Sequence, residues 1–483
     1  MSEKSKNIAW YSRGGHLDLF CRLNAKLSEE NEIVGSFFVC HTSEEEQKIK
    51  DNYSQDPRNL GKYLHYKRKG FKIDEKRIEE LAEEYNFIPL KRLLWSEISE
   101  RNPSEETLIF NLVTHFEFWE DFLKNNNISS VFTEGPSILS TCVLWAVCNK
   151  LEIECISFGN WCIDGRLIFS KKWGCDIVGY EDTYNNLKLD QSSTDYKFSL
   201  DYLKKMQETP EKPKYTSINL VTGKKGRPTS SPFPKTPSLK KIISLKSKLQ
   251  ENRTNYYLNK SQRLRSYSSW FLKLSRITIH KFFSSYLERG LDLDKERYFM
   301  FPLHTLNEWQ NYSQMGMKYP NVLNLIEEIS SCIPLGYKLY VKEHPSFFPQ
   351  KDNSFYKAIK KIRNVRLIHP DEDNFKLVKK SEGVITTAST MGWEAYLLGK
   401  LVFMLVDHWS QILPGVYKIK NPEELVKSLQ NHKKLRVSNE QEKLEAVYAL
   451  HQVSFKGALY PISRNMSEEN INNLYNPVKA IIN

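Results

Sequence analysis

Two short stretches carry residue types that suit the binding of a phosphate group. In LYVKEHPSF (339–347), His344 follows a strand-like run, and Pro345 ends that strand and restricts the backbone before it. In GVITTASTMGWEAYLLGK (383–400), Ser389 or Thr390 is a good helix N-cap, and Gly392 would let a ligand approach the backbone. A helix start attracts anions, so the two stretches predict two walls of one phosphate site. Each stretch also has a purely structural alternative: His344 could simply cap a loop, and the second stretch could be an ordinary capped helix.

Alternating strands and helices must position these residues. In the first two hundred residues, apolar strand-like runs such as NIAWYS, IVGSFFVC, SSVFT and IECISF alternate with helical periodicity, and a second alternating series begins near Arg297. This rhythm predicts parallel sheets with helices on both faces. Ligands bind beyond the carboxyl ends of such strands, which is where His344 lies. The sequence therefore predicts two doubly wound α/β domains with a cleft between them.

The bulk composition narrows the class of protein. A chain of 483 residues with 40% hydrophobic content is too long for one core, so two or three domains are expected. No apolar run reaches the length of a membrane span, and the first residues lack a secretion signal, which favours a cytoplasmic location. None of the eight cysteines forms a CxxC pair, so we expect reduced, mostly buried thiols. We identify no cluster of metal ligands, and neither a metal nor a cofactor is expected.

The positive charge of the chain is concentrated in one segment. Residues 204–281 contain nineteen Lys or Arg and three acids, a surplus of sixteen positive charges in a chain whose net charge is +12. The segment is rich in Pro, Lys, Ser and Thr and dotted with aromatic residues, which predicts a linker or helical excursion between the domains. Three partners suit it: an anionic membrane surface, an acidic polysaccharide, or nucleic acid. The membrane ranks first and nucleic acid is disfavoured, because no nucleic-acid motif accompanies the charge. A solvated linker without a partner is the fourth alternative.

Three motifs in the second half are familiar in this order. FPLHTLNEW (301–309), KEHP (342–345) and TTASTMGWEAYLLGK (386–400) resemble the capsule polysaccharide biosynthesis family, which includes Kdo transferases. The His-Pro and Ser-Ser/Thr motifs also resemble those of bacterial sialyltransferases, and all of these enzymes have the GT-B glycosyltransferase fold. In the first half the resemblance is thinner and extends to SRGGH (12–16), TEGPS (133–137) and SFGNWCIDGRL (157–167).

The resemblance implies a role for several residues in holding a nucleotide-sugar donor. It implies that His344, Pro345, Ser389 and Thr390 hold the phosphate of a CMP-activated sugar. Glu394, one turn into the same helix, is then placed to bind a ribose hydroxyl, and its alternative is a solvated glutamate. His304 lies on the same strand edge. Lys342 is expected to support the phosphate charge, although a strand-end lysine is usually only solvated.

The first half is expected to hold the acceptor. Gly14 and Gly15 permit a tight turn after the first strand, so that His16 faces the cleft. Glu134 directly follows the SSVFT strand and is the candidate base that takes a proton from the attacking hydroxyl, with a carboxylate that complements a helix dipole as the alternative. The sialyltransferase pattern has an acidic pair here, whereas this chain has threonine at the first position. Two further candidates are Asp164 and Arg166, whose guanidinium would pair with an acidic sugar.

These inferences predict a metal-independent glycosyltransferase of GT-B type. Its donor is expected to be a CMP-linked acidic sugar, such as Kdo or a sialic-acid-like sugar, and its acceptor a capsule, lipopolysaccharide or other surface glycan. The alternatives are a transferase that uses a UDP-sugar or CDP-polyol, and a non-catalytic scaffold in polysaccharide assembly. The predicted division of the chain is an acceptor domain (1–203), the basic segment (204–290), a donor domain (291–440) and a helical tail (441–483).

Overall fold

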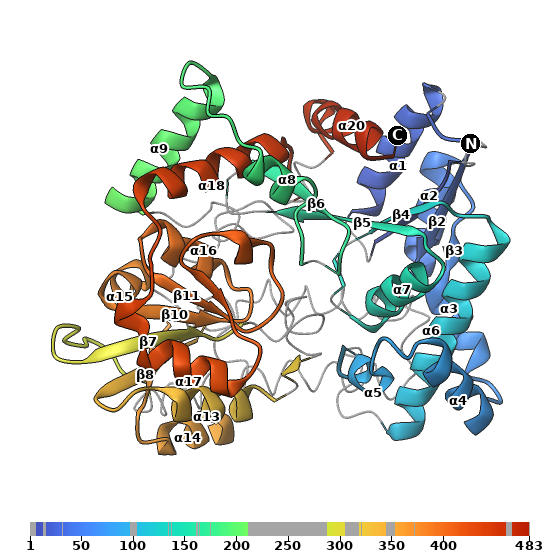
Figure 1. Cartoon of the computed structure of the whole chain (residues 1–483). Coiled ribbons are helices and arrows are strands. Elements are labelled where there is room, and N and C mark those ends of the chain that lie inside the picture. The colour runs from blue at the N-terminus through green and yellow to red at the C-terminus, as the bar shows by residue number, and fades with distance from the viewer. Residues whose placement is uncertain are drawn as a thin grey trace, which may run out of the picture.

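The computed structural model forms two α/β units, each built around one sheet (Figure 1). It describes residues 6–12, 16–30, 32–96, 104–133, 135–136, 138–160, 163, 165–173, 175–210, 287–304, 318–319, 321–343, 353–370, 372–459 and 466–482. The prediction of two α/β domains with largely parallel sheets is therefore confirmed. Within these residues, no helix is long and apolar enough to cross a bilayer.

The first sheet has seven strands in the order β13-β6-β5-β4-β1-β2-β3. Its strands are β1 (Asn7–Tyr11), β2 (Gly35–Cys40), β3 (Arg58–Asn59), β4 (Ser130–Thr133), β5 (Glu154–Asn160), β6 (Arg166–Ser170) and β13 (Phe455–Lys456). The first five pair in parallel, whereas β6 runs antiparallel to both β5 and β13. The chain between β5 and β6 is too short for the crossover of about a dozen residues that a parallel neighbour needs.

Helices cover both faces of this sheet. They are α1 (Leu17–Glu29), α2 (Ser43–Tyr53), α3 (Leu60–Lys67), α4 (Glu75–Glu84), α5 (Leu90–Leu93), η1 (Leu94–Ser96), α6 (Glu105–Asn125), α7 (Leu139–Lys150) and α20 (Glu468–Ile482). Alternate residues of β1 point to opposite sides: Ala9 and Tyr11 pack among α3, α6 and α7, while Ile8 and Trp10 pack among α1 and α20. The sheet is thus buried on both sides, as its apolar strands require.

The second sheet is parallel throughout, in the order β12-β11-β10-β7-β8-β9. Its strands are β7 (Arg297–Pro302), β8 (Tyr337–Lys342), β9 (Val365–Ile368), β10 (Gly383–Thr386), β11 (Leu401–Met404) and β12 (Val416–Lys418). Numbered from β7, this is the order 3-2-1-4-5-6 read across the sheet, the order of doubly wound nucleotide-binding folds. The order reverses between β7 and β10.

Two helical layers cover this second sheet. The helices of this unit are α8 (Tyr180–Asn185), α9 (Thr194–Glu208), α13 (Val322–Cys332), α14 (Asn353–Lys361), α15 (Asn374–Lys380), α16 (Thr390–Leu397), η5 (Trp409–Ile412), α17 (Pro422–Gln430), η6 (His432–Lys434) and α18 (Glu440–Val453). Phe299 and Phe301 pack with α13, α14 and α17, whereas Tyr298 and Met300 pack with α15, α16 and α18.

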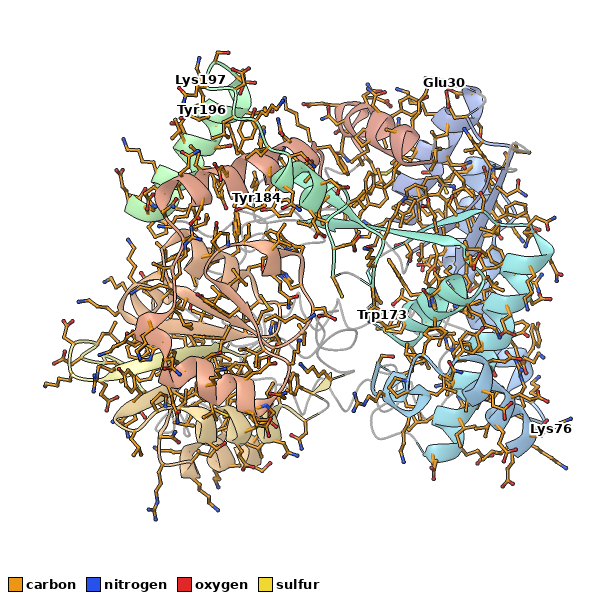
Figure 2. The ribbon with its side chains drawn as sticks, in the orientation of Figure 1. Glu30, Lys76, Trp173, Tyr184, Tyr196 and Lys197 are labelled. Carbon is orange, nitrogen blue, oxygen red and sulfur yellow. The ribbon has the colours of Figure 1, made fainter. Side chains whose placement is uncertain are left out.

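The chain changes unit before and after the second sheet. Helices α8 and α9 precede the basic segment, yet Tyr180, Leu203 and Met206 share a core with the second sheet. Tyr184 and Tyr196 accordingly lie beside α18 (Figure 2). At the other end, α20 packs on α1 of the first unit (Figure 1). The expected boundary at residue 203 therefore runs through a helix that belongs to the second core.

These contacts also correct the expected place of the basic segment. The structure describes only its ends, residues 204–210 and 287–290. Its flanks, α9 and β7, both pack in the second core, so it leaves and rejoins the same unit instead of linking two domains. Its composition indicated only that it buries little surface and did not locate it between domains.

The described cysteines are unpaired, and all but Cys175 are buried. This confirms the expectation of free, largely buried thiols for these seven residues. Cys162 lies outside the described residues.

One buried histidine predicts a measurable loss of stability in acid. His115 of α6 is fully buried, its Nδ1 bonds the Asn111 carbonyl oxygen, and burial lowers its pKa to about 4. Stability from the neutral ring is complete above its ordinary pKa of about 6.5 and is lost as the pH falls toward 4. We expect the free energy of unfolding to fall by up to about 3 kcal/mol more than in His115→Gln, at about 1.4 kcal/mol per pKa unit.

Urea unfolding of both proteins between pH 7 and pH 4 measures this difference. Exposed His65 of α3 supplies the control, because His65→Gln makes the same replacement at a position that the fold does not bury. Equal pH dependence of the wild-type protein and His115→Gln would show that the ring is not held neutral.

Candidate functional site

The strands that carry the described donor-site candidates end at one edge of the second sheet. Pro302 of β7 pairs with Lys342 of β8, and Lys342 pairs with Ile368 of β9. The β7–β10 register pairs Met300 with Val384, so Thr386 ends level with Pro302. The carboxyl ends of β7, β8, β9 and β10 therefore lie at one level. A ligand crevice is expected at the reversal of strand order, between β7 and β10.

Hydrogen bonds fix the turn that connects β10 to α16. Thr386 Oγ1 accepts from the Ser389 backbone N–H at 3.0 Å, and Ser389 Oγ accepts from the Met391 N–H at 3.2 Å. Ser389 is thus the N-cap, as one of the two residues predicted for that role, and Thr390 is the exposed first residue of α16. Ala388, which lies between Thr386 and Ser389, is buried and has a φ of +77°, a conformation costly for a residue with a side chain. The turn holds this strain and directs the start of α16 to the strand edge.

Two other predicted residues lie on α16. A Cβ on Gly392 would lie 3.1 Å from Thr386 Cγ2 and 3.5 Å from Val402 Cγ1, so its missing side chain lets the helix pack closely on the sheet. A role in ligand approach stays a prediction. Glu394 is only 7% exposed, which rules out the solvated-glutamate alternative.

Polar residues at the ends of β7 and β8 are also buried. His304 is 6% exposed and Lys342 is 2% exposed, so Lys342 is not a solvated strand-end lysine. Lys342 Nζ donates to the Pro370 carbonyl oxygen at 2.9 Å. Beside it, Tyr356 of α14 donates its hydroxyl hydrogen to Glu343 Oε2 at 2.6 Å, which anchors the residue before His344.

A second strand-end histidine escaped the sequence reasoning. His369 follows β9, is fully buried, and its Nε2 accepts from Arg289 Nη2. Burial, and after it the nearby charges of Arg289 and Lys342, lowers its pKa to about 4, so the ring is neutral at physiological pH. The signal was present, because LIHP (367–370) repeats the strand-His-Pro pattern of YVKEHP (340–345).

The first sheet presents its candidates at the corresponding edge. Its parallel strands also reverse order between β1 and β4, and these strands lead into the SRGGH and TEGPS motifs. Of these motifs, His16 begins α1 and is 5% exposed, while Thr133 ends β4 fully buried. Thr133 Oγ1 has no hydrogen-bond partner within the described part of the chain.

Arg166 joins the two units. Its guanidinium donates to Ser454 Oγ at 2.7 Å, to the His451 carbonyl oxygen at 2.8 Å, and to the Ser454 carbonyl oxygen. The Nδ1 atom of His451 also lies 3.2 Å from Oδ1 of Asp195 in α9. These bonds occupy Nε and Nη2, so the expected pairing with a sugar carboxylate has only Nη1 to use.

Several predicted residues lie outside the described residues. They are Glu134, His344, Pro345, Gly14, Gly15 and Asp164. Their roles stay predictions, together with the ligand-binding roles of the described candidates.

Comparison with known proteins supports the family. Residues 218–456 match the family model described as capsule polysaccharide biosynthesis protein, a region that includes all six strands of the second sheet. This confirms the resemblance carried by the three motifs. No curated protein matches the chain.

Solved structures match only distantly. A beta Kdo 2,7 transferase, KpsC from Thermosulfurimonas dismutans, is 12% identical over 74% of this chain and 88% of its own, with a TM-score of 0.35. A UDP-GlcNAc 2-epimerase from Neisseria meningitidis, bound to UDP-GlcNAc, is 12% identical over 99% and 98%, with a TM-score of 0.29. A glycosyltransferase from Rickettsia africae is 10% identical over 99% of both chains, with a TM-score of 0.26. Likeness at this level identifies neither donor nor reaction.

The turn before α16 predicts a stability difference between two threonines. Thr386→Val keeps the shape of the side chain but removes the acceptor of the Ser389 N–H, and Thr386 is fully buried. We expect a loss of about 1–3 kcal/mol in the free energy of unfolding. Thr390→Val, at the exposed neighbouring position, should change it by less than about 0.5 kcal/mol. Chemical denaturation measures both, and equal values would contradict the assigned role of Thr386.

Proposed function

We propose that this chain, whose residues 218–456 belong to the capsule polysaccharide biosynthesis family, is a glycosyltransferase that moves a sugar from a nucleotide donor to a surface glycan or glycolipid. One observation supports the proposal: the described candidates His304, Lys342 and Ser389 follow or end β7, β8 and β10, neighbouring strands at the place where the strand order reverses. Near that edge, Ser389 caps the start of α16, and Glu394 of this helix is buried. The strand-end residues His304 and Lys342 are buried there as well. Nucleotide-binding sheets of this order use the same place.

The donor we propose is a CMP-linked acidic sugar such as Kdo or a sialic-acid-like sugar. The support is the motif resemblance together with the capped turn at Ser389, which aims the positive end of α16 at the strand edge. His344 follows β8 by two residues, and its neighbour Glu343 is held by Tyr356. In this proposal, His344, Ser389 and Thr390 grip the phosphate and Glu394 binds a ribose hydroxyl.

The proposed mechanism stabilises charge on the leaving phosphate. As the bond from the anomeric carbon to the phosphate oxygen breaks, negative charge grows on the nucleotide. His344 and the N–H groups at the start of α16 stabilise that charge because they are already oriented. Protein groups thus take the role that a divalent ion plays in other transferases.

The acceptor is proposed to bind at the first sheet's edge, after β1 and β4. Glu134 takes the proton from the acceptor hydroxyl as its oxygen attacks the anomeric carbon. Gly14, Gly15, His16 and Asp164 form the surrounding wall in this proposal. The buried hydroxyl of Thr133, next to Glu134, is a polar group that suits such a wall.

The basic segment is proposed to hold the enzyme at an anionic membrane surface. Its surplus of sixteen positive charges and its aromatic residues suit that role. Because its flanks pack in the second unit, the contact would bring the donor-binding unit to the membrane.

A nucleotide panel tests the donor. A nucleotide at about a hundred times its Kd stabilises its protein by about 2.7 kcal/mol, so CMP should raise the melting temperature more than CDP, UMP, UDP or GDP. His344→Ala should abolish that shift and lower turnover by roughly 10²–10³, the cost of losing one donor to a developing oxyanion. His65→Ala is the exposed control. A shift in melting temperature only with uridine nucleotides would show that the donor is a UDP-sugar and not a CMP-sugar. A turnover loss below about threefold in His344→Ala would show that His344 does not bind the donor phosphate.

Glu394 predicts recognition of the ribose. The wild-type protein should bind CMP about tenfold more tightly than an analogue without the ribose hydroxyl, because that analogue cannot donate a hydrogen bond to the buried Glu394 carboxylate. In Glu394→Gln, CMP should bind more weakly, while whichever of 2′-deoxy CMP and 3′-deoxy CMP lacks the bound hydroxyl should change little. Calorimetric titration of the three ligands measures this difference. Equal weakening of all three would assign Glu394 a structural role.

A further inference from the structure

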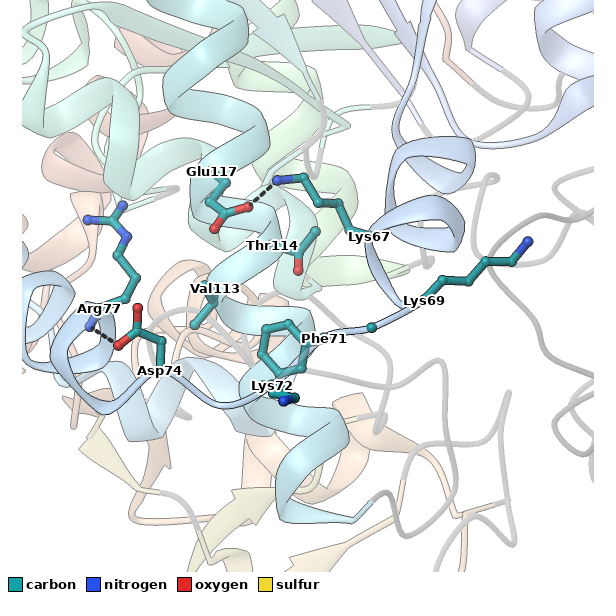
Figure 3. A pocket seen from close by; sticks show the side chains of 10 residues that line it. Lys67, Lys69, Phe71, Lys72, Asp74, Arg77, Val113, Thr114 and Glu117 are labelled. Atoms are coloured by element: carbon teal, nitrogen blue, oxygen red, sulfur yellow. Dashed lines mark hydrogen bonds and ion pairs between the residues drawn. The ribbon is translucent and has the colours of Figure 1, made fainter.

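A basic hollow on the first unit lies outside the strand edges described above. It has a volume of about 250 Å³ and is formed by the end of α3, the loop that follows, the start of α4, and the middle of α6 (Figure 3). The volume is below the range of roughly 300–1,000 Å³ that holds drug-sized ligands. It therefore suits one sugar ring or one anionic group better than a whole nucleotide.

Four cations and two carboxylates line the hollow, a surplus of two positive charges. Lys67 pairs with Glu117 at 3.1 Å, and Arg77 pairs with Glu120 at 3.2 Å. Lys69 and Lys72 also line the hollow, and neither forms an ion pair with any residue the structure describes. Two cations thus remain available to a ligand.

The loop conformation places these two lysines on the rim. Gly70, which lies between them in the chain, has a φ of +82°, a conformation that glycine adopts without strain. The loop ends at Asp74, whose carboxylate caps α4 by accepting from the Arg77 N–H. Lys69 and Lys72 therefore project from a loop that is fixed at both ends, by α3 and α4. Lys72 lies beside the Phe71 ring, whereas the Lys69 side chain extends outward from the rim (Figure 3).

The floor of the hollow is partly apolar. The Phe71 ring lines it and is held by an edge-on contact with Phe110, their centroids 4.9 Å apart. Val113 and Thr114 of α6 complete the floor, and both are buried. An aromatic face beside cations and hydrogen-bonding oxygens fits a ring with one apolar face, several hydroxyls and an acidic group.

We propose that this hollow binds an acidic sugar unit of the glycan acceptor, away from the reacting end. Lys72 binds its carboxylate or phosphate, Lys69 adds positive charge at the rim, and the Phe71 ring packs against its carbon skeleton. Its identity as part of the acceptor rests on the proposed function, whereas anion binding by the hollow does not. A flat anionic membrane is the rival partner, because Tyr66 and Ile73 are exposed nearby, at 59% and 43%. The concave shape and the aromatic floor favour the sugar.

Direct binding tests the proposal without any transfer reaction. Calorimetry with a glucuronic-acid oligosaccharide as probe should give binding that weakens with salt, while a neutral glucose oligosaccharide of equal length should not bind. Lys69→Glu with Lys72→Glu should weaken binding at least tenfold, and Phe71→Ala about fivefold. Lys76→Glu is the matched control, because Lys76 of neighbouring α4 is exposed (Figure 2) and does not line the hollow.

Three results would overturn the proposal. They are the absence of binding, binding that survives the double substitution, and binding that Lys76→Glu weakens equally. Flotation with vesicles of phosphatidylglycerol and phosphatidylcholine covers the rival partner: capture that the double substitution abolishes, without oligosaccharide binding, would assign the hollow to a membrane. Failure of the nucleotide panel leaves these results unaffected, so the two proposals fail separately.

Discussion

Parallel pairing of the strands is the constraint from which the candidate site follows. When neighbouring strands run in the same direction, their carboxyl ends and the loops after them lie at one edge of the sheet. In the second sheet, α13 leaves from β7 to one face and α16 leaves from β10 to the other. Within the described residues, the two helices therefore diverge from the edge between these strands, where a ligand can reach several strand ends. The first sheet repeats the arrangement, with α1 after β1 and α7 after β4 on opposite faces.

This edge accommodates polar groups that a folded interior normally excludes. Burial of a charge or polar atom without a partner costs several kcal/mol, so such groups are retained only where they are bonded. Lys342 bonds a carbonyl oxygen, Glu343 accepts from a tyrosine, and His369 is kept neutral between cations. The adjacent turn adds the strain of Ala388. Buried polar groups and backbone strain, both unfavourable to folding, are concentrated at this one strand edge. Such a concentration is more typical of a ligand-binding site than of a purely structural part of the fold.

Much of the second unit was predictable from the sequence, because its strands are apolar runs bounded by turn residues and its helices show regular periodicity. The N-cap at Ser389 was predictable for the same local reason. The burial of Lys342 and Glu394 was not, because it depends on β9 and on the tight packing of α16, which no short pattern shows. Gly392 illustrates the difference: its sequence context indicated ligand approach, whereas its contacts are with β10 and β11.

The order of elements along the chain gave wrong domain boundaries where a segment of one half packs in the core of the other. Helices α8 and α9 precede the basic segment and α20 follows the second sheet, yet each packs in the core of the other half. Periodicity reports that a helix has an apolar face but does not report which sheet covers it. Arg166 shows how the exchange is held, since this residue of the first sheet bonds the end of α18, where the chain returns to pair β13 with β6. The guanidinium spans two units because both crossing segments meet at β6. Arg166 was predicted to bind a ligand. Two of its three guanidinium nitrogens instead connect the unit proposed to hold the acceptor with the unit proposed to hold the donor.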